Sequence, residues 1–231
     1  MQQQWWRIGG SRLKLVAEKQ RNYYHTIQAI PREISGPRIS ARDRAQGRIP
    51  AVVLSPSGSD SQKQLLTTEL KQINSLLKTV EPQFFCSTTF KLQVRAGSGS
   101  SLLLHSGNVL PIKLHRDEET GKVLNLIFKW AEEGAKLEVD IPVVFKGAES
   151  CPGLNKGGQL NTIRKTLKYL CPTECIPQKI EVDISKLDLG DRIFMKDIEV
   201  DPALKLLSGN ETKPICKIVA STVESLKPLE A

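Results

Sequence analysis

Residues 32–54 read R-E-I-S-G-P-R-I-S-A-R-D-R-A-Q-G-R-I-P-A-V-V-L, which joins an arginine-rich segment to an apolar run. Its first part is rich in arginine, and Ser40 is placed to cap a short helix over residues 40–46 that ends at Gly47. Residues 49–54 then form a continuous apolar run, which is typical of a buried strand. The stretch therefore predicts an arginine-bearing helix that leads directly into the core of a β-structure.

The positive charge of the chain is concentrated around this stretch. Of 231 residues, the first 50 hold ten Lys and Arg against three Asp and Glu, a net charge of +7 out of the chain's +8. A basic stretch beside a nearly neutral body is the usual electrostatic footprint of a protein that binds a polyanion. Charge alone leaves one alternative open, a solvated basic tail that binds nothing.

The residue types in and beyond the basic stretch suit RNA. Arginine offers a planar fork of donors that binds two phosphate oxygens at once. Duplex RNA has a deep, narrow major groove, so proteins reach it through phosphates and through the 2′-hydroxyls of the minor groove. Ser40 and Asn125 can read 2′-hydroxyls, and the adjacent His115 and Arg116 offer a second contact strand.

The rest of the chain predicts a mainly β-protein with a few helices. Leu and Ile recur at helical spacing over residues 62–78, which predicts an amphipathic helix. Alternation of apolar and polar residues predicts strands at 26–30 (an edge strand), 84–96, 102–105, 109–115 and 122–129. After a composition shift at 131–134, further strands are expected at 137–145 (antiparallel, with one solvated face), 159–171, 179–185, 191–197 and 214–221. We therefore expect a basic extension at 1–24, a first β domain at 25–131 and a smaller β domain at 132–231.

The chemistry of enzymes and metal sites is not indicated. No common catalytic motif is present, and the glycines at 153–158 lie between strands, where a hairpin loop is expected rather than a phosphate cradle. Five scattered cysteines indicate reduced thiols, and the C-P-T-E-C pair Cys171 and Cys175 lacks a second pair at zinc spacing. We expect no catalytic residue, metal or cofactor. No apolar run approaches the ~18 residues of a membrane helix, so no membrane partner is expected.

The first residues of the chain suggest an organelle. The first acid is Glu18, and the residues before it include two tryptophans, two arginines and several apolar side chains. This composition is typical of an organelle presequence, either cleaved or retained as a docked tail. It predicts a mitochondrial location, with the bacterial cytoplasm as the alternative.

The arginine-rich stretch resembles the signature of the bacterial-type large-subunit ribosomal protein family L twenty-five, whose long members are also called CTC general stress proteins. The residues that match in order and without a gap are Arg32, Gly36, Ser40, Arg42, Arg44, Arg48, Pro50 and Ala51. The resemblance to the long, two-domain form continues in I-P-V-V-F-K-G at 141–147, N-K-G-G-Q-L at 155–160, C-I-P-Q-K-I-E-V-D-I-S-K-L-D-L-G-D at 175–191 and I-C-K-I-V-A at 215–220. It spans roughly residues 25–221.

The resemblance implies a structural, non-enzymatic ribosomal protein. Its first domain would be a β-barrel that binds 5S rRNA, and its second would link the barrel to neighbouring ribosomal proteins and rRNA. The chain would act within the large subunit and not as an autonomous homo-oligomer. The RNA contacts that the resemblance implies fall on Arg32, Arg38, Ser40, Arg42, Arg44, Arg48, His115, Arg116 and Asn125.

The chain departs from the family pattern at three places. Leu54 stands where the family has an aromatic residue, N-L-I-F at 125–128 replaces a His-x-Asp-Phe motif, and the loop at 117–119 is acidic. These changes affect the later strands and not the arginine-rich helix. The acidic loop at 117–119 and the lost His and Asp favour a second hypothesis, a ribosome-associated module of the same fold that contacts mainly neighbouring proteins.

Overall fold

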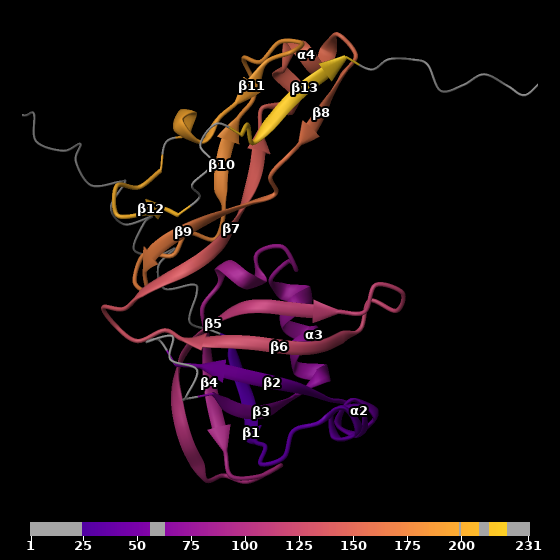
Figure 1. The fold of residues 1–231 in the computed structure, drawn as a ribbon, viewed down its shortest axis with the longest axis vertical. Coiled ribbons are helices and arrows are strands. Elements are labelled where there is room, and N and C mark those ends of the chain that lie inside the picture. Colours follow the sequence, from indigo (N-terminus) through magenta and orange to yellow (C-terminus); the bar gives the residue numbers. More distant parts are fainter. Residues whose placement is uncertain (1–24, 56–62, 199, 208–212, 221–231) are drawn as a thin grey trace, which may run out of the picture. The chain divides into compact units, whose positions relative to one another are not determined.

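The computed structural model describes residues 25–55, 63–198, 200–207 and 213–220, and the predicted extension at 1–24 lies outside them. The chain forms two compact units that divide between Leu137 and Glu138, beyond the boundary predicted after residue 131. Both units are built mainly from strands, with three α-helices among the described residues (Figure 1). The predicted fold class, a mainly β-protein with a barrel and a second β domain, is confirmed.

The first unit is a closed six-stranded barrel in the order β1-β3-β2-β6-β5-β4. Its strands are β1 (Thr26–Pro31), β2 (Arg48–Leu54), β3 (Gln64–Glu69), β4 (Phe90–Arg95), β5 (Leu103–Arg116) and β6 (Val123–Trp130). Strand β1 closes the barrel, because it runs antiparallel to β3 on one side and parallel to β4 on the other. The prediction of an edge strand at 26–30 is therefore wrong, since a strand that closes a barrel is paired along both edges.

The barrel interior follows from the alternation of the strands. Along β1, Ile27 and Ala29 are buried while Gln28 between them is exposed, and β4 buries alternate residues in the same way. Helix α3 (Leu70–Thr79) covers part of the core with Ile73, Leu76 and Leu77. Each large apolar side chain removed from water contributes about 1.5–3 kcal/mol. The largest of these core side chains are Phe85, Phe90, Phe128, Ile27, Ile49, Leu66, Ile73, Leu92 and Leu126.

Several boundaries in the first unit differ from the prediction. The helix expected at 62–78 is strand β3 followed by α3, because residues 64–69 pair with both β1 and β2 and this pairing overrides their helical spacing. The strand expected at 84–96 is shorter, since η2 (Phe85–Ser87) is a 3₁₀ turn ahead of β4. The two strands expected at 102–105 and 109–115 are one long strand, β5.

Long strand β5 passes beneath Trp130 at Gly107. A Cβ at position 107 would lie 2.9 Å from Cζ3 of the Trp130 ring, closer than real Cβ atoms approach other atoms. The imidazole of His105 forms a T-shaped contact with the same ring, with centroids 4.6 Å apart and planes at 87°. Glycine at 107 therefore makes the packing of this tryptophan possible.

The second unit contains two sheets. One has the order β10-β7-β9-β12, with β7 (Lys136–Lys146), β9 (Thr166–Pro172), β10 (Ile180–Asp183) and β12 (Lys205–Leu206). The other has the order β11-β13-β8, with β8 (Gly158–Thr162), β11 (Arg192–Ile193) and β13 (Cys216–Ala220). Short 3₁₀ and α turns complete the unit: η3 (Ala148–Ser150), α4 (Pro152–Asn155) and η4 (Met195–Asp197).

Two predictions for the second unit need correction. Strand β7 was expected to be antiparallel, but it pairs in parallel with β10, Val143 opposite Ile180. The strand expected at 159–171 is divided into β8 and β9, which belong to different sheets. The chain bends between them because the N–H groups of Ile163 and Arg164 both donate to the carbonyl of Ile215.

Replacing Gly107 by alanine should destabilise the barrel. The added methyl group meets the Trp130 ring, which packs against the barrel core, so Gly107→Ala should lower the free energy of unfolding by about 1–3 kcal/mol. Urea unfolding followed by tryptophan fluorescence measures this change. Gly97→Ala is the control, because a Cβ at Gly97 meets nothing within 4 Å. Equal midpoints for Gly107→Ala and wild type would show that the ring does not pack on this glycine.

Candidate nucleic-acid interface

The arginine-rich helix α2 (Pro37–Ala45) packs against strand β2 of the barrel. It starts earlier than predicted because Pro37 occupies its first turn, where the missing N–H costs nothing. Gly36 is its N-cap, and Ser40 lies inside the helix, so the predicted capping role of Ser40 is wrong. Gly47, with φ of +76°, ends the helical segment and donates its N–H to the carbonyl of Arg44.

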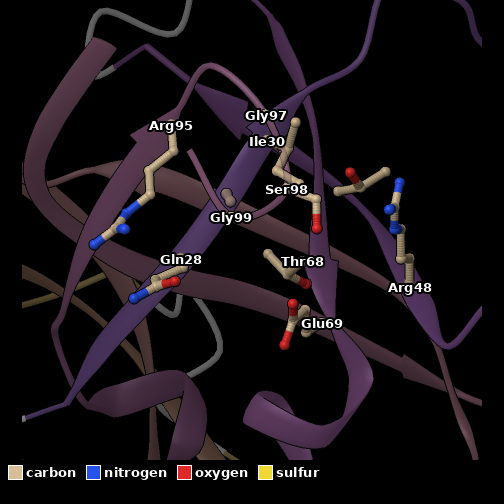
Figure 2. A pocket seen from close by; sticks show the side chains of 11 residues that line it. Gln28, Ile30, Arg48, Thr68, Glu69, Arg95, Gly97, Ser98 and Gly99 are labelled. Carbon is tan, nitrogen blue, oxygen red and sulfur yellow. The ribbon is translucent and has the colours of Figure 1, made fainter. Parts of the chain in front are cut away.

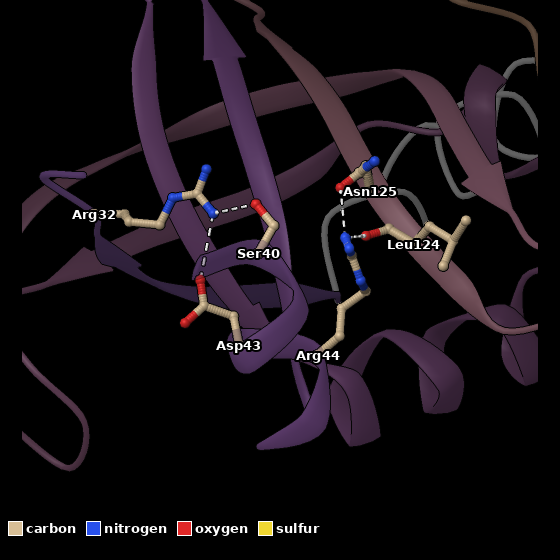
Figure 3. Close-up of polar contacts among 6 residues, drawn as sticks. All are labelled: Arg32, Ser40, Asp43, Arg44, Leu124 and Asn125. Atoms are coloured by element: carbon tan, nitrogen blue, oxygen red, sulfur yellow. Dashed lines mark hydrogen bonds and ion pairs between the residues drawn. The ribbon is translucent and has the colours of Figure 1, made fainter. Parts of the chain in front are cut away.

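One side of the helix is bound to the end of β1 through Arg32. The Nη1 group of Arg32 donates to Ser40 Oγ and to Asp43 Oδ2, both at 3.3 Å (Figure 3). The side chains of Arg32 and Asp43 are each only 12% exposed, so this ion pair is largely removed from water. The Arg32 backbone N–H also donates to the carbonyl of Leu65, which fixes the residue on the barrel. We call Arg32, Ser40 and Asp43 the helix clamp.

The helix is also bound to strand β6, through Arg44. Its Nη1 group donates to the Leu124 carbonyl and to Asn125 Oδ1, both at 3.4 Å (Figure 3). These bonds link residues 80 and 81 positions apart in the sequence. Together with the helix clamp, they hold α2 at two points, so its orientation on the barrel is fixed before any ligand arrives.

Arg38 and Arg42 are the exposed arginines of the helix. They are four residues apart and therefore share one side of it. Neither side chain is bound to another described residue, in contrast to Arg32 and Arg44. A fixed helix that presents two uncommitted guanidinium groups to water can bind phosphate oxygens without first breaking internal bonds.

Strands β5 and β6 lie beside α2 and carry three more of the predicted contact residues. His115 lies directly opposite Asn125 in the pairing of the two strands, and its side chain is exposed. Because Asn125 accepts from Arg44, the structure brings Arg44, Asn125 and His115 into one row. Arg116 is half-buried, and its Nε atom is buried without a hydrogen-bond partner.

The turn that joins β5 to β6 is acidic. Asp117 accepts a hydrogen bond from the Thr120 hydroxyl, and its carbonyl accepts from the Gly121 N–H at 2.9 Å. Glu118 and Glu119 in this turn are exposed. Their charge repels phosphate near Arg116, so the positive surface is strongest at the helix and weakens toward this turn.

Arg48 has a separate environment at the start of β2. It lies opposite Glu69 of β3 in the strand register and lines a small hollow with Gln28 and the turn of residues 97–99 (Figure 2). The hollow holds about 30 Å³, enough for water and far below the ~300 Å³ of a small-molecule site. Its size gives no support to a substrate or cofactor there.

The structure therefore separates the predicted contact residues into groups. Arg38, Arg42 and His115 are exposed. Arg32, Ser40, Arg44 and Asn125 are engaged in bonds within the protein. Arg48 and Arg116 are half-buried at other positions. Sequence reasoning missed Asp43 as a partner. The available signal was a lone acid within a run of arginines, three residues after Ser40 and therefore on the same side of the helix.

The described residues were also compared with the requirements of a metal site, a reactive thiol and a membrane span. No cluster of three or more His, Cys, Asp or Glu suited to a metal ion occurs among them. Cys151, Cys171 and Cys216 are buried as free thiols, and burial raises the pKa of Cys171 to about 11. Within the described part of the chain, the helices are too short and too polar to cross a membrane.

A barrel that carries a fixed, arginine-bearing helix and is followed by a second β unit suits a structural protein that binds a polyanion. Residues 27–128 match the family model described as the Ribosomal L25p family, and residues 136–222 match the model described as the C-terminal domain of ribosomal protein TL5. The chain belongs to the ribosomal L25p family. This is a family of ribosomal structural proteins, which confirms the prediction that the chain is not an enzyme.

The relatives are bacterial proteins named large ribosomal subunit protein bL25. The protein of Erythrobacter litoralis is 30% identical over 173 residues, which cover 75% of this chain and 69% of the relative. That of Methylocella silvestris is 29% identical over 209 residues, covering 89% and 85%. That of Thermotoga petrophila is 27% identical over 198 residues, covering 86% and 87%. In each comparison the matched region includes most of both chains.

The helix clamp should contribute to stability as a coupled pair. Arg32→Leu leaves the Asp43 carboxylate largely buried without its cation, which should cost about 3 kcal/mol of unfolding free energy. The double variant Arg32→Leu/Asp43→Leu leaves no unpaired charge and should regain most of this loss. Urea unfolding of wild type, both single variants and the double variant gives the coupling energy. Glu33→Gln, at an exposed neighbour, is the control. Additive effects of the two single variants would contradict a clamp.

Proposed function

We propose that the chain is a structural constituent of the large ribosomal subunit that binds 5S rRNA through α2 and the adjoining β5–β6 surface. The observation that carries the proposal is the double attachment of α2, by the helix clamp and by Arg44, which leaves Arg38 and Arg42 exposed on a fixed element. Membership of the L25p family supports the ribosomal role. The choice of 5S rRNA as the ligand rests on the family resemblance of residues 32–54.

The mode of binding follows from the shape of duplex RNA. A short, rigid helix can lie along the RNA backbone, with Arg38 and Arg42 on phosphate oxygens and His115 reaching a second strand. Arg32, Ser40, Arg44 and Asn125 would act by holding the helix, and any donor they have left can face a 2′-hydroxyl. Arg48 and Arg116 would add positive charge at the margins. Because α2 is already fixed, little conformational entropy is lost on binding.

A second candidate is a ribosome-associated module that contacts mainly neighbouring proteins. The exposed pair Glu118 and Glu119 favours it, since this turn repels RNA at the β5–β6 end of the surface. Under this hypothesis the barrel would keep the fold of its family, and the arginines of α2 would have no RNA ligand.

Removing the two exposed arginines should weaken 5S rRNA binding and make it less salt-dependent. Each arginine on a phosphate releases counterions, so the slope of log affinity against log salt should fall by about 0.9 for each of Arg38→Gln and Arg42→Gln. Titration of the full chain with 5S rRNA at several salt concentrations measures both quantities. An unrelated duplex RNA of equal length serves as competitor.

Lys91→Gln is the matched control for this experiment. Lys91 is exposed on β4, three strands away from β2 around the closed barrel in either direction, so the same loss of charge occurs on the opposite side. Affinity and salt slope should match wild type. If Arg38→Gln and Arg42→Gln bind 5S rRNA as tightly as Lys91→Gln does, the RNA proposal fails and the protein-contact module becomes the leading hypothesis.

For the compartment, we propose the mitochondrion, on the acid-poor, arginine-bearing composition of residues 1–24. The relatives compared above are bacterial, so the alternative is a bacterial ribosome. Isolated mitochondria with a membrane potential should import the full chain and protect it from added protease. Removal of residues 1–24 should abolish protection, because the presequence-like composition lies in these residues. Equal protease sensitivity of both forms would contradict a mitochondrial location.

A further inference from the structure

The second unit carries a cationic sheet face that the proposed function does not use. In the sheet β11-β13-β8, Ile193, Cys216 and Ile218 are buried on one side. Strand alternation places the residues between them on the opposite side. That face, which we call the cationic face, consists of Arg192, Lys217, Asn161, Gln159 and Val219. All are exposed except Lys217, which is half-buried (strands labelled in Figure 1).

Arg192 and Lys217 lie directly opposite each other across β11 and β13. Residues in this relation have Cβ atoms about 4.5–5.5 Å apart, and like charges there destabilise a sheet. No described residue forms an ion pair or a hydrogen bond with either side chain. The carboxylate of Asp191, next to Arg192 in sequence, accepts instead from the Asp188 N–H at 2.8 Å. The repulsion between the two cations is therefore uncompensated within the described protein.

Elsewhere in the same unit, three lysines are paired with acids. Glu181 forms ion pairs with Lys146 and Lys179, and these pairs lower the pKa of its carboxyl. Lys156 pairs with Asp188 at 2.5 Å. The cationic face departs from this arrangement, because its five residues include two cations and no acid. An external anion would relieve the repulsion between the two cations.

We propose that the cationic face binds the phosphodiester backbone of RNA, as a second RNA contact apart from α2. Asn161 lies beside Lys217 in the register, and Gln159 lies beside Val219. Their amides can donate to phosphate and accept from ribose hydroxyls. The face has no aromatic side chain for base stacking, so it reads the backbone and not the sequence. Protein interfaces depend on large apolar or aromatic anchors, and Val219 alone supplies little of that.

The test measures binding of the full chain to a labelled 20-base-pair RNA duplex of arbitrary sequence over a salt series. Arg192→Gln/Lys217→Gln should bind roughly tenfold more weakly at low salt, with a slope shallower by about 1.8, the value for two lost phosphate contacts. The melting temperature of this variant should not fall, because the substitution removes a repulsion. The matched control is Lys168→Gln/Lys205→Gln, which removes two exposed charges from the other sheet of the unit.

The cationic face depends on the proposed function only for the claim that its RNA ligand is ribosomal. The outcomes of the two experiments are therefore independent of each other. Loss of duplex binding in Arg192→Gln/Lys217→Gln, with wild-type binding in the control, supports the cationic face whether or not Arg38→Gln and Arg42→Gln affect 5S rRNA binding. Equal losses in both double variants would overturn it, since net charge alone would then explain the effect. Displacement of the duplex by a poly-glutamate peptide at lower concentration than by unlabelled RNA would also overturn it, in favour of an acidic protein partner.

Discussion

The closure of the barrel by β1 is the constraint on which the rest of the first unit depends. Strand β1 is antiparallel to β3 and parallel to β4, so it joins the two ends of the strand order and closes the barrel. Residue 32 follows β1 directly and residue 48 opens β2, so helix α2 must span the gap between two strands that already have fixed positions. The orientation of the arginine-rich helix is in this way a consequence of barrel closure, which the bonds of Arg32 and Arg44 then secure.

The arginines of the motif divide between structure and binding. Arg32 shares a mostly water-excluded ion pair with Asp43, and Arg44 is bonded to a backbone carbonyl and an amide of β6. Such bonds hold each guanidinium in one direction, whereas Arg38 and Arg42 keep all their donors for an external anion. An arginine-rich stretch thus supplies both the attachment of a surface element and the charge it presents. Counting arginines overstates the number of phosphates that this surface can neutralise.

Much of the fold can be predicted from local sequence patterns, and the predictions that were wrong have physical causes. The buried strand after the helix and the arginine-bearing helix itself follow from the run at 32–54, because each pattern reflects a local period. Residues 64–69 show helical spacing but form a strand, since pairing with β1 and β2 is a long-range effect that no local period reveals. The same holds for the parallel pairing of β7 with β10. The spacing of Arg38 and Arg42 predicts that they share one side of the helix, whereas their exposure and the partner of Arg32 required the fold.

The two candidate RNA surfaces are encoded in different ways. At α2, charge is concentrated in sequence, so the net charge of the first 50 residues reveals it. In the second unit, Arg192 and Lys217 are 25 positions apart and the surrounding chain is nearly neutral, so only the strand register shows that they are neighbours. A nearly neutral domain can therefore carry a local anion site when its acids are paired elsewhere, as Glu181 and Asp188 are. Because the Debye length is about 8 Å at physiological salt, the local arrangement of charge, and not the net charge of the unit, governs the contact.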